Sequence, residues 1–220
     1  MNNILLCEGS TDYTLLQYYM RKAYGWSDDK GIQNSVFKVN KQKSRKLSKN
    51  DSFLTIAAVG GCSRLIEGLE LAIERNKYAA PNHTDFFDSI VIITDRDELL
   101  TEKNFIDKIN KIFLESGIGY QRNIVNNQWI ECNMTNNVGL HLKFRFLLLI
   151  IPFEQNGAME TFLLNAIADD NLYDKEIIKK CNHFVDTIDP EKRYLSNRRL
   201  ITKAKFDTYF SVRTSAEQFC

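Results

Sequence analysis

Three short apolar runs, each followed by a helical pattern, restrict the fold of this chain more than any other feature. The runs are rich in β-branched and aliphatic residues, and each ends in a polar or glycine-containing turn. The runs cover residues 3–7, 53–59 and 88–94, and the helical patterns cover 11–24, 65–73 and 98–116. Strands that alternate with helices in this way form right-handed crossovers and a mainly parallel sheet. We therefore predict an α/β fold, a mainly parallel sheet flanked by helices.

The second part of the chain has a different pattern. Residues 120–151, with an Asn126-Asn127 turn, predict an antiparallel hairpin that ends in a core strand over 146–151. Helical patterns follow at 158–168, 174–188 and 196–210. We predict a core over residues 1–152 and a helical C-terminal extension over 153–220, packed on the same domain. Within the core, residues 27–51 form a polar, basic insertion with a short strand at 35–39.

Composition places the chain among globular proteins. It has 220 residues, of which 44% are hydrophobic and 26% charged. The longest apolar run, 146–151, is far shorter than the roughly 20 residues that cross a bilayer, and Met1-Asn2-Asn3 lacks the basic start of a signal peptide. We expect a cytoplasmic protein without a membrane contact. The five cysteines contain no C-x-x-C pair, so reduced thiols are favoured over disulfides or zinc.

Local basic stretches stand out against a net charge of +1. Residues 36–50 hold six basic side chains and no acid, and residues 192–213 hold seven with one aspartate. Such stretches suit the phosphates of DNA or RNA, although they also suit a solvated surface. The nucleic-acid contacts that we expect are Lys41, Lys43, Arg45, Lys46, Arg198 and Arg199.

Acidic residues follow the predicted strands. Glu8 ends the first strand, Asp12 lies in the next helical turn, Asp95 and Asp97 follow the third strand, and a glycine pair at 60–61 follows the second. The carboxyl ends of parallel strands meet at one edge of a sheet. Carboxylates 4 Å apart there would repel by about 4 kcal/mol per pair, so a cation is expected among them. Oxygen ligands favour Mg²⁺ or Mn²⁺, which activate water against a phosphodiester.

These motifs resemble the Toprim domain of topoisomerases, bacterial primases, RNase M-five maturases and the nucleases of the overcoming-lysogenization-defect (OLD) family. The matching segments are residues 4–12, 59–61 and 90–97. The Glu-Gly-x-x-Asp form and residues 157–164 look most like the OLD-type nucleases and their small stand-alone relatives. The resemblance implies a metal-dependent nuclease that acts on DNA or RNA by a two-metal mechanism. A role in phage defence follows by analogy alone.

The resemblance also implies roles for individual residues. Asp95 and Asp97 would hold one ion, Glu8 would bridge or act as general base, and Asp12 with Glu160 would complete a second ion site about 4 Å away. Lys203 or Lys205 would stabilise the developing negative charge.

The chain departs from the family pattern in two respects. Ala158 stands where a hydroxyl residue often precedes the family's glutamate by two positions, and no G-x-x-x-x-G-K-[ST] motif occurs. Any ATP-driven control would therefore come from a separate ATPase protein. An oligomer is compatible with the sequence.

Three other interpretations are open. The chain could be a non-catalytic Toprim-like module that binds nucleic acid or a protein partner. Asp95-Arg96-Asp97 also resembles the nucleophile loop of haloacid-dehalogenase-type phosphatases, although that loop follows the opening strand of its fold. Cys62, after the glycine pair, could be a thiolate at a helix N-terminus, but nothing in the sequence places a histidine near it.

Overall fold

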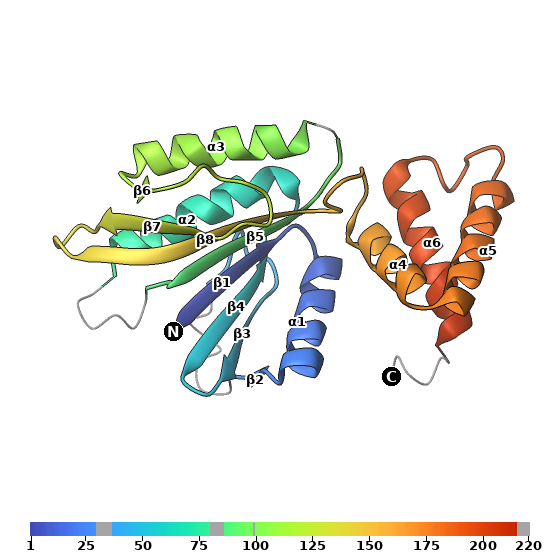
Figure 1. Cartoon of the computed structure of the whole chain (residues 1–220), viewed down its shortest axis with the longest axis horizontal. Coiled ribbons are helices and arrows are strands. Elements are labelled where there is room, and N and C mark those ends of the chain that lie inside the picture. Colours follow the sequence, from blue (N-terminus) through green and yellow to red (C-terminus); the bar gives the residue numbers. More distant parts are fainter. Residues whose placement is uncertain (30–36, 80–85, 99, 215–220) are drawn as a thin grey trace. The chain divides into compact units, whose positions relative to one another are not determined.

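The computed structural model describes residues 1–29, 37–79, 86–98 and 100–214 (Figure 1). The chain divides into two compact units. Residues 1–94 and 98–150 form the first, called the sheet unit below, and residues 95–97 and 151–220 form the second, called the helical unit. The predicted start of the extension at residue 153 lies close to this division.

The sheet unit contains one sheet with the strand order β2-β3-β4-β1-β5-β8-β7-β6. The strands are β1 (Asn2–Cys7), β2 (Ser27–Asp28), β3 (Ser44–Lys49), β4 (Ser52–Ala58), β5 (Ser89–Asp95), β6 (Gly119–Tyr120), β7 (Ile130–Thr135) and β8 (His141–Ile151). The central strands β4, β1 and β5 are parallel, while β2, β3 and β4 on one side and β6, β7 and β8 on the other pair antiparallel. The predicted α/β class and the parallel core are confirmed.

Three helices flank the sheet. They are α1 (Ser10–Tyr24), α2 (Leu65–Lys77, after the 3-10 turn η1, Cys62–Arg64) and α3 (Thr101–Glu115). Figure 1 shows α2 and α3 on one face of the sheet and α1 on the other. α1 ends at Gly25, which adopts the left-handed conformation with a φ of 67°. Glycine is the residue that most readily adopts this conformation at a helix end.

One hydrophobic core fills the space between the sheet, α2 and α3. Ile4 and Leu6 of β1 are fully buried in it, together with Ile90 and Ile92 of β5. These positions alternate along parallel strands whose central residues are all apolar, and such a continuous apolar run is typical of a buried strand.

The stretch 27–51, predicted as a basic insertion, contains two strands that the sequence did not predict, β2 and β3. Leu47 is the one buried side chain of β3, and the strand forms because all of its residues pair with β4. The short strand expected at 35–39 is not found at residues 37–39, and residues 35 and 36 lie outside the described residues.

The turn of the antiparallel hairpin also differs from the prediction. The hairpin is confirmed, but β7 and β8 meet at residues 136–140 rather than at Asn126-Asn127. Asn136 accepts hydrogen bonds from the backbone of Val138 and Leu140 and so shapes that turn. The side chain of Asn126 instead pairs with the backbone of Ile150 in β8. Its Nδ2 donates to the carbonyl of Ile150, and its Oδ1 accepts from the N–H of Ile150.

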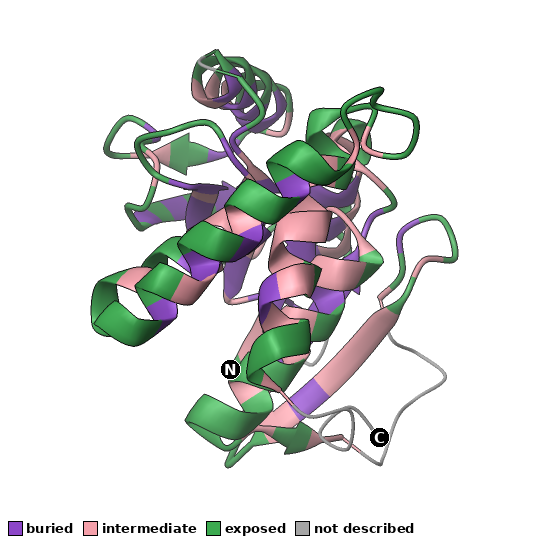
Figure 2. Ribbon diagram, turned by 90° about the vertical axis from the view of Figure 1, so that its right-hand side faces the viewer, coloured by how far each residue is buried: buried purple, intermediate pink, exposed green. Residues whose placement is uncertain are grey.

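The helical unit consists of α4 (Met159–Asp170), α5 (Leu172–Ile188) and α6 (Arg198–Arg213), close to the predicted ranges. Its small core contains Leu164, Ile178, Cys181 and Tyr209. The hydroxyl of buried Tyr209 donates to the buried carboxylate of Asp174 at 2.9 Å, which joins α6 to α5. In Figure 2 the buried residues of these helices form narrow stripes between exposed ones.

Candidate functional site

The carboxyl ends of β4, β1 and β5 lie side by side, as the sequence predicted. The backbone carbonyl of Glu8, after β1, accepts hydrogen bonds from the N–H groups of Gly60 and Gly61, both at 2.9 Å. These glycines have φ angles of 89° and 130°, where other residues are strained. The glycine pair therefore brings the backbone after β4 against Glu8.

The side chain of Glu8 is held by a residue that the sequence analysis did not single out. The hydroxyl of Thr94, near the end of β5, lies 2.5 Å from Oε1 of Glu8 and donates to it. Thr94 is buried and lies 3.9 Å from Sγ of Cys62 at the start of η1. Only the parallel pairing of β1 with β5 brings Thr94 and Glu8 together, so sequence reasoning could have found Thr94 only by aligning those two strand ends.

Asp12 lies at the same end of the sheet unit, on the first turn of α1. Its Oδ2 accepts a hydrogen bond from the N–H of Gly9 at 2.9 Å, so Asp12 helps to fix the start of α1. Burial raises the pKa of the nearby Cys7 thiol well above its ordinary 9.0, and the negative charges of Asp12 and Glu8 raise it further. Both carboxylates are therefore close enough to Cys7 to raise its pKa, and Cys7 remains a thiol.

Asp95, Arg96 and Asp97 belong to the helical unit. Oδ1 of Asp95 accepts from the N–H of Met159 at 3.0 Å, at the N-terminus of α4, where a negative charge is favoured. Arg96 is buried, and its backbone N–H and Nε donate to the carbonyls of Ile151 and Pro152 at 2.7 and 2.8 Å. This segment is therefore fixed against the start of α4.

The other acid ligands predicted for this unit differ in exposure. Asp97 forms an ion pair with Arg198, and both side chains are about half exposed. Glu160 is buried in the first turn of α4, as expected of an acid that compensates the helix dipole. A half-exposed ion pair is weak, so a cation can compete with Arg198 for Asp97.

The predicted basic residues of the helical unit are unequal candidates. Nζ of Lys205 lies 2.8 Å from Oδ1 of Asp186, which ties α6 to α5. Lys203 is half-buried on α6, and Arg199 is exposed. Because Lys205 already has a carboxylate partner, Lys203 is the better candidate for a transition-state contact.

The basic stretch of the sheet unit is partly neutralised by two aspartates at the neighbouring strand β2. Arg45 lies 3.5 Å from Asp28 and donates to Gln17, and Lys46 lies 3.5 Å from Asp29. Lys41 and Lys43, before β3, are exposed. The count of basic residues over 36–50 did not include these acids, which are close in the sheet although they precede the basic stretch in sequence.

The donor chemistry of these acids suits Mg²⁺ or Mn²⁺, since carboxylate and hydroxyl oxygens are the ligands that both ions prefer. Among the residues that the structure describes, no group of three or more His, Cys, Asp or Glu side chains is close enough together to hold a metal ion.

The four described cysteines, Cys7, Cys62, Cys132 and Cys181, are free thiols. In the same described residues no helix is both long and apolar enough to span a membrane.

The fold is an α/β fold in which Glu8 and Asp12 lie at the carboxyl edge of a parallel sheet. The chain belongs to the family described as "Protein of unknown function (DUF3226)", whose profile matches residues 2–218. No curated protein matches the chain significantly.

Two solved structures are similar to the chain. A hypothetical protein, PH0156 from Pyrococcus horikoshii OT3, is 14% identical with a TM-score of 0.53, over 99% of this chain and 92% of that one. At this identity the likeness concerns the fold alone. A glyoxalase/bleomycin resistance protein/dioxygenase family enzyme from Burkholderia phytofirmans PsJN is 11% identical over 67% of this chain and 97% of that one. Its TM-score of 0.22 is too low for any inference.

Proposed function

We propose that this chain is a Toprim-like, metal-dependent phosphodiester hydrolase that cuts DNA or RNA with Mg²⁺ or Mn²⁺. The observation that supports the proposal most is the meeting of three strand ends at Glu8. Its carbonyl is held by Gly60 and Gly61 after β4, and its carboxylate is held by Thr94 at the end of β5. A carboxylate fixed by a buried hydroxyl is oriented before any substrate arrives, which is what a general base needs.

In the proposed reaction Glu8 takes the proton of the attacking water, whose oxygen bonds to phosphorus as the bond to the leaving sugar oxygen breaks, and a solvent water protonates that oxygen as it leaves. Asp95 and Asp97 are the residues that would hold a divalent ion, and Asp12 and Glu160 are the further ligands predicted from the sequence. A bound ion supplies a lowered water pKa and neutralises charge on the phosphodiester. Lys203 stabilises the negative charge that develops on the phosphate oxygens.

A second candidate is a non-catalytic module that binds nucleic acid or a protein partner. It is favoured by the protein contacts of two predicted ligands, since Asp95 accepts from Met159 and Asp97 pairs with Arg198. The phosphatase alternative has less support. Asp95 ends β5, which follows the complete units β1–α1 and β4–α2, whereas that family's nucleophile follows the opening strand.

Cleavage assays separate the two candidates. The full chain is incubated with plasmid, single-stranded DNA or RNA in Mn²⁺ or Mg²⁺, beside Asp95→Asn and Glu8→Gln. Asn at position 95 keeps an oxygen that can accept from Met159, so it removes the charge without removing the cap of α4. Asp107→Asn, at an exposed position of α3, is the matched control.

A nuclease predicts cleavage by the wild type and by Asp107→Asn, with loss of cleavage in Asp95→Asn and Glu8→Gln at unchanged thermal stability. A gel shift without cleavage in any metal would support the binding module. Cleavage that survives both substitutions would contradict the proposed site.

A further inference from the structure

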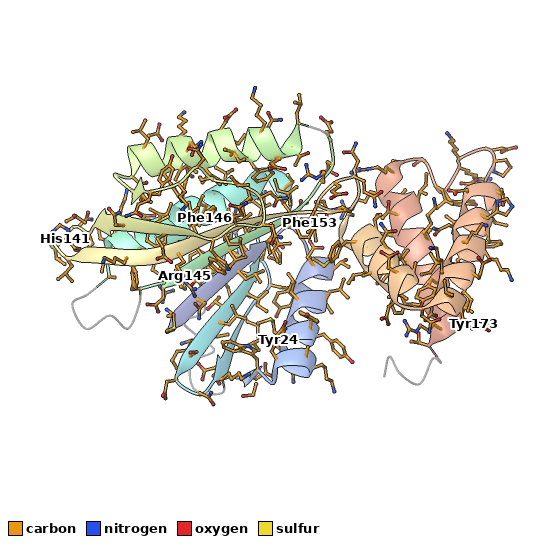
Figure 3. All side chains as sticks on the ribbon, in the orientation of Figure 1. Tyr24, His141, Arg145, Phe146, Phe153 and Tyr173 are labelled. Atoms are coloured by element: carbon orange, nitrogen blue, oxygen red, sulfur yellow. The ribbon has the colours of Figure 1, made fainter. Side chains whose placement is uncertain are left out.

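Three tyrosines on α1 are exposed to an unusual degree. The side chains of Tyr18, Tyr19 and Tyr24 are 62%, 54% and 50% exposed. Tyr24 is labelled in Figure 3, at the end of α1. Large aromatic rings that stay more than half exposed in a group are a common feature of binding surfaces.

Two of these rings contact each other, and the third contacts a lysine. The rings of Tyr19 and Tyr24 meet edge to face, with centroids 5.4 Å apart and hydroxyls 3.4 Å apart. Nζ of Lys22 lies 5.9 Å from the ring centroid of Tyr18. Side chains that are already ordered lose less conformational entropy on binding a ligand than free ones do.

The same surface carries an excess of positive charge. Beside the C-terminal half of α1, on the sheet face that carries this helix, four basic side chains lie with one aspartate, Asp28, which leaves three positive charges in excess. Asp28 is shared by two arginines, Arg21 at 3.6 Å and Arg45 at 3.5 Å. Lys49 donates to the carbonyl of Tyr24 at 2.6 Å, so a cation also lies at the end of the tyrosine group. The four basic residues are Arg21, Lys22, Arg45 and Lys49.

We infer that this surface, the tyrosine platform of Tyr18, Tyr19 and Tyr24 with its four basic neighbours, binds single-stranded nucleic acid. Aromatic rings stack on the faces of bases, and the basic side chains neutralise the phosphates between them. A duplex hides its base faces within the stack and offers only phosphates to such a surface. The platform therefore favours a single strand over a duplex of the same length.

This inference rests on the proposed function only for the claim that the bound strand is the substrate. Binding itself requires no metal and no cleavage. It also assigns binding to residues of α1 that the sequence analysis did not include among the basic contacts. The tyrosines carry the discrimination between strand and duplex, and the basic residues carry the dependence on salt.

The test is fluorescence anisotropy of labelled single-stranded oligonucleotides and the matching duplex, in EDTA, with the full chain. Tyr18→Ala and Tyr19→Ala should each weaken single-strand binding at least about fivefold, because each ring stacks with a base. Tyr19→Phe should bind like the wild type, since it keeps the ring. Tyr78→Ala is the matched control, a tyrosine 70% exposed beside Glu74 on α2.

Salt adds a second measurement. If the three excess charges each neutralise one phosphate, affinity should fall by about 20-fold between 50 and 200 mM salt. Equal affinity for single strand and duplex, or equal weakening by Tyr78→Ala and Tyr19→Ala, would overturn the inference. Binding in EDTA without any cleavage in Mn²⁺ would uphold the platform and refute the nuclease, so the two failures are distinguishable.

Discussion

The sheet unit and the helical unit are stabilised in different ways. The sheet unit has an extensive core in which strands distant in sequence, such as β1 and β5, bury the same face. The helical unit has a small core of Leu164, Ile178, Cys181 and Tyr209, and a polar link between Tyr209 and Asp174 in the middle of it. The difference extends to the acids. Glu8 in the sheet unit is held by a buried hydroxyl, whereas Asp97 in the helical unit is held by a half-exposed arginine.

The two units therefore fix the acidic side chains of Glu8 and Asp97 to different degrees. A buried donor such as Thr94 cannot leave its acceptor without a desolvation cost, so Glu8 is oriented. A half-exposed ion pair is worth little, so Asp97 can exchange Arg198 for another cation. A base must be fixed and a metal ligand must be accessible, which agrees with the roles proposed for these two residues.

The largest expected effects come from substitutions that leave a cavity in the core of each unit. Leu6→Ala should lower the free energy of unfolding of the sheet unit by about 2–5 kcal/mol, because Leu6 is fully buried among residues that cannot collapse into the space. Leu164→Ala should cost about 2 kcal/mol, at the low end of that range, because half-buried neighbours can close around it.

Urea denaturation separates these effects. Trp26 and Trp129 both lie in the sheet unit, so tryptophan fluorescence follows that unit while far-UV circular dichroism follows the whole chain. A larger loss for Leu164→Ala than for Leu6→Ala would contradict the comparison of the cores.

A smaller effect is expected at the backbone beneath Glu8. Gly60→Ala should cost about 1–3 kcal/mol, because the φ of 89° is unfavourable for a residue with a Cβ atom. Gly60→Asn is the matched variant and should cost less, since Asn tolerates positive φ better than Ala. Equal losses in both variants, measured in urea, would mean that crowding by Gln42, 3.1 Å from the added Cβ, outweighs backbone strain.

The smallest effect is expected at Arg198. Arg198→Gln should change the free energy of unfolding by less than about 1 kcal/mol, because exposed ion pairs contribute little. Thermal melts of the variant beside Arg199→Gln, an exposed neighbour, provide the check. A loss of several kcal/mol in Arg198→Gln alone would show that the Asp97 pair is structural and would weaken the case for Asp97 as a ligand.

Much of the fold could be predicted from the sequence because its signals are local. The strands β1, β4 and β5 are apolar runs bounded by turns, and Gly25 marks the end of α1. Strand β3 could not be predicted, because its apolar content is Leu47 and its pairing with β4 is what makes it a strand.

The candidate site shows the same limit. Glu8 stands out in the sequence because it directly follows an apolar run, and Asp12 because it lies in the first turn of the helix that comes next. Thr94 and the aspartates beside Arg45 and Lys46 do not stand out, because their roles depend on which strands and segments become neighbours.

Binding of Mn²⁺, measured by titration calorimetry on the full chain, tests the central claim most directly. The wild type and Asp107→Asn should bind Mn²⁺, and Asp95→Asn and Glu8→Gln should each lose a site while keeping the wild-type melting temperature. Equal Mn²⁺ binding by all four proteins, or none by the wild type at millimolar Mn²⁺, would contradict a metal-dependent hydrolase built on these acids.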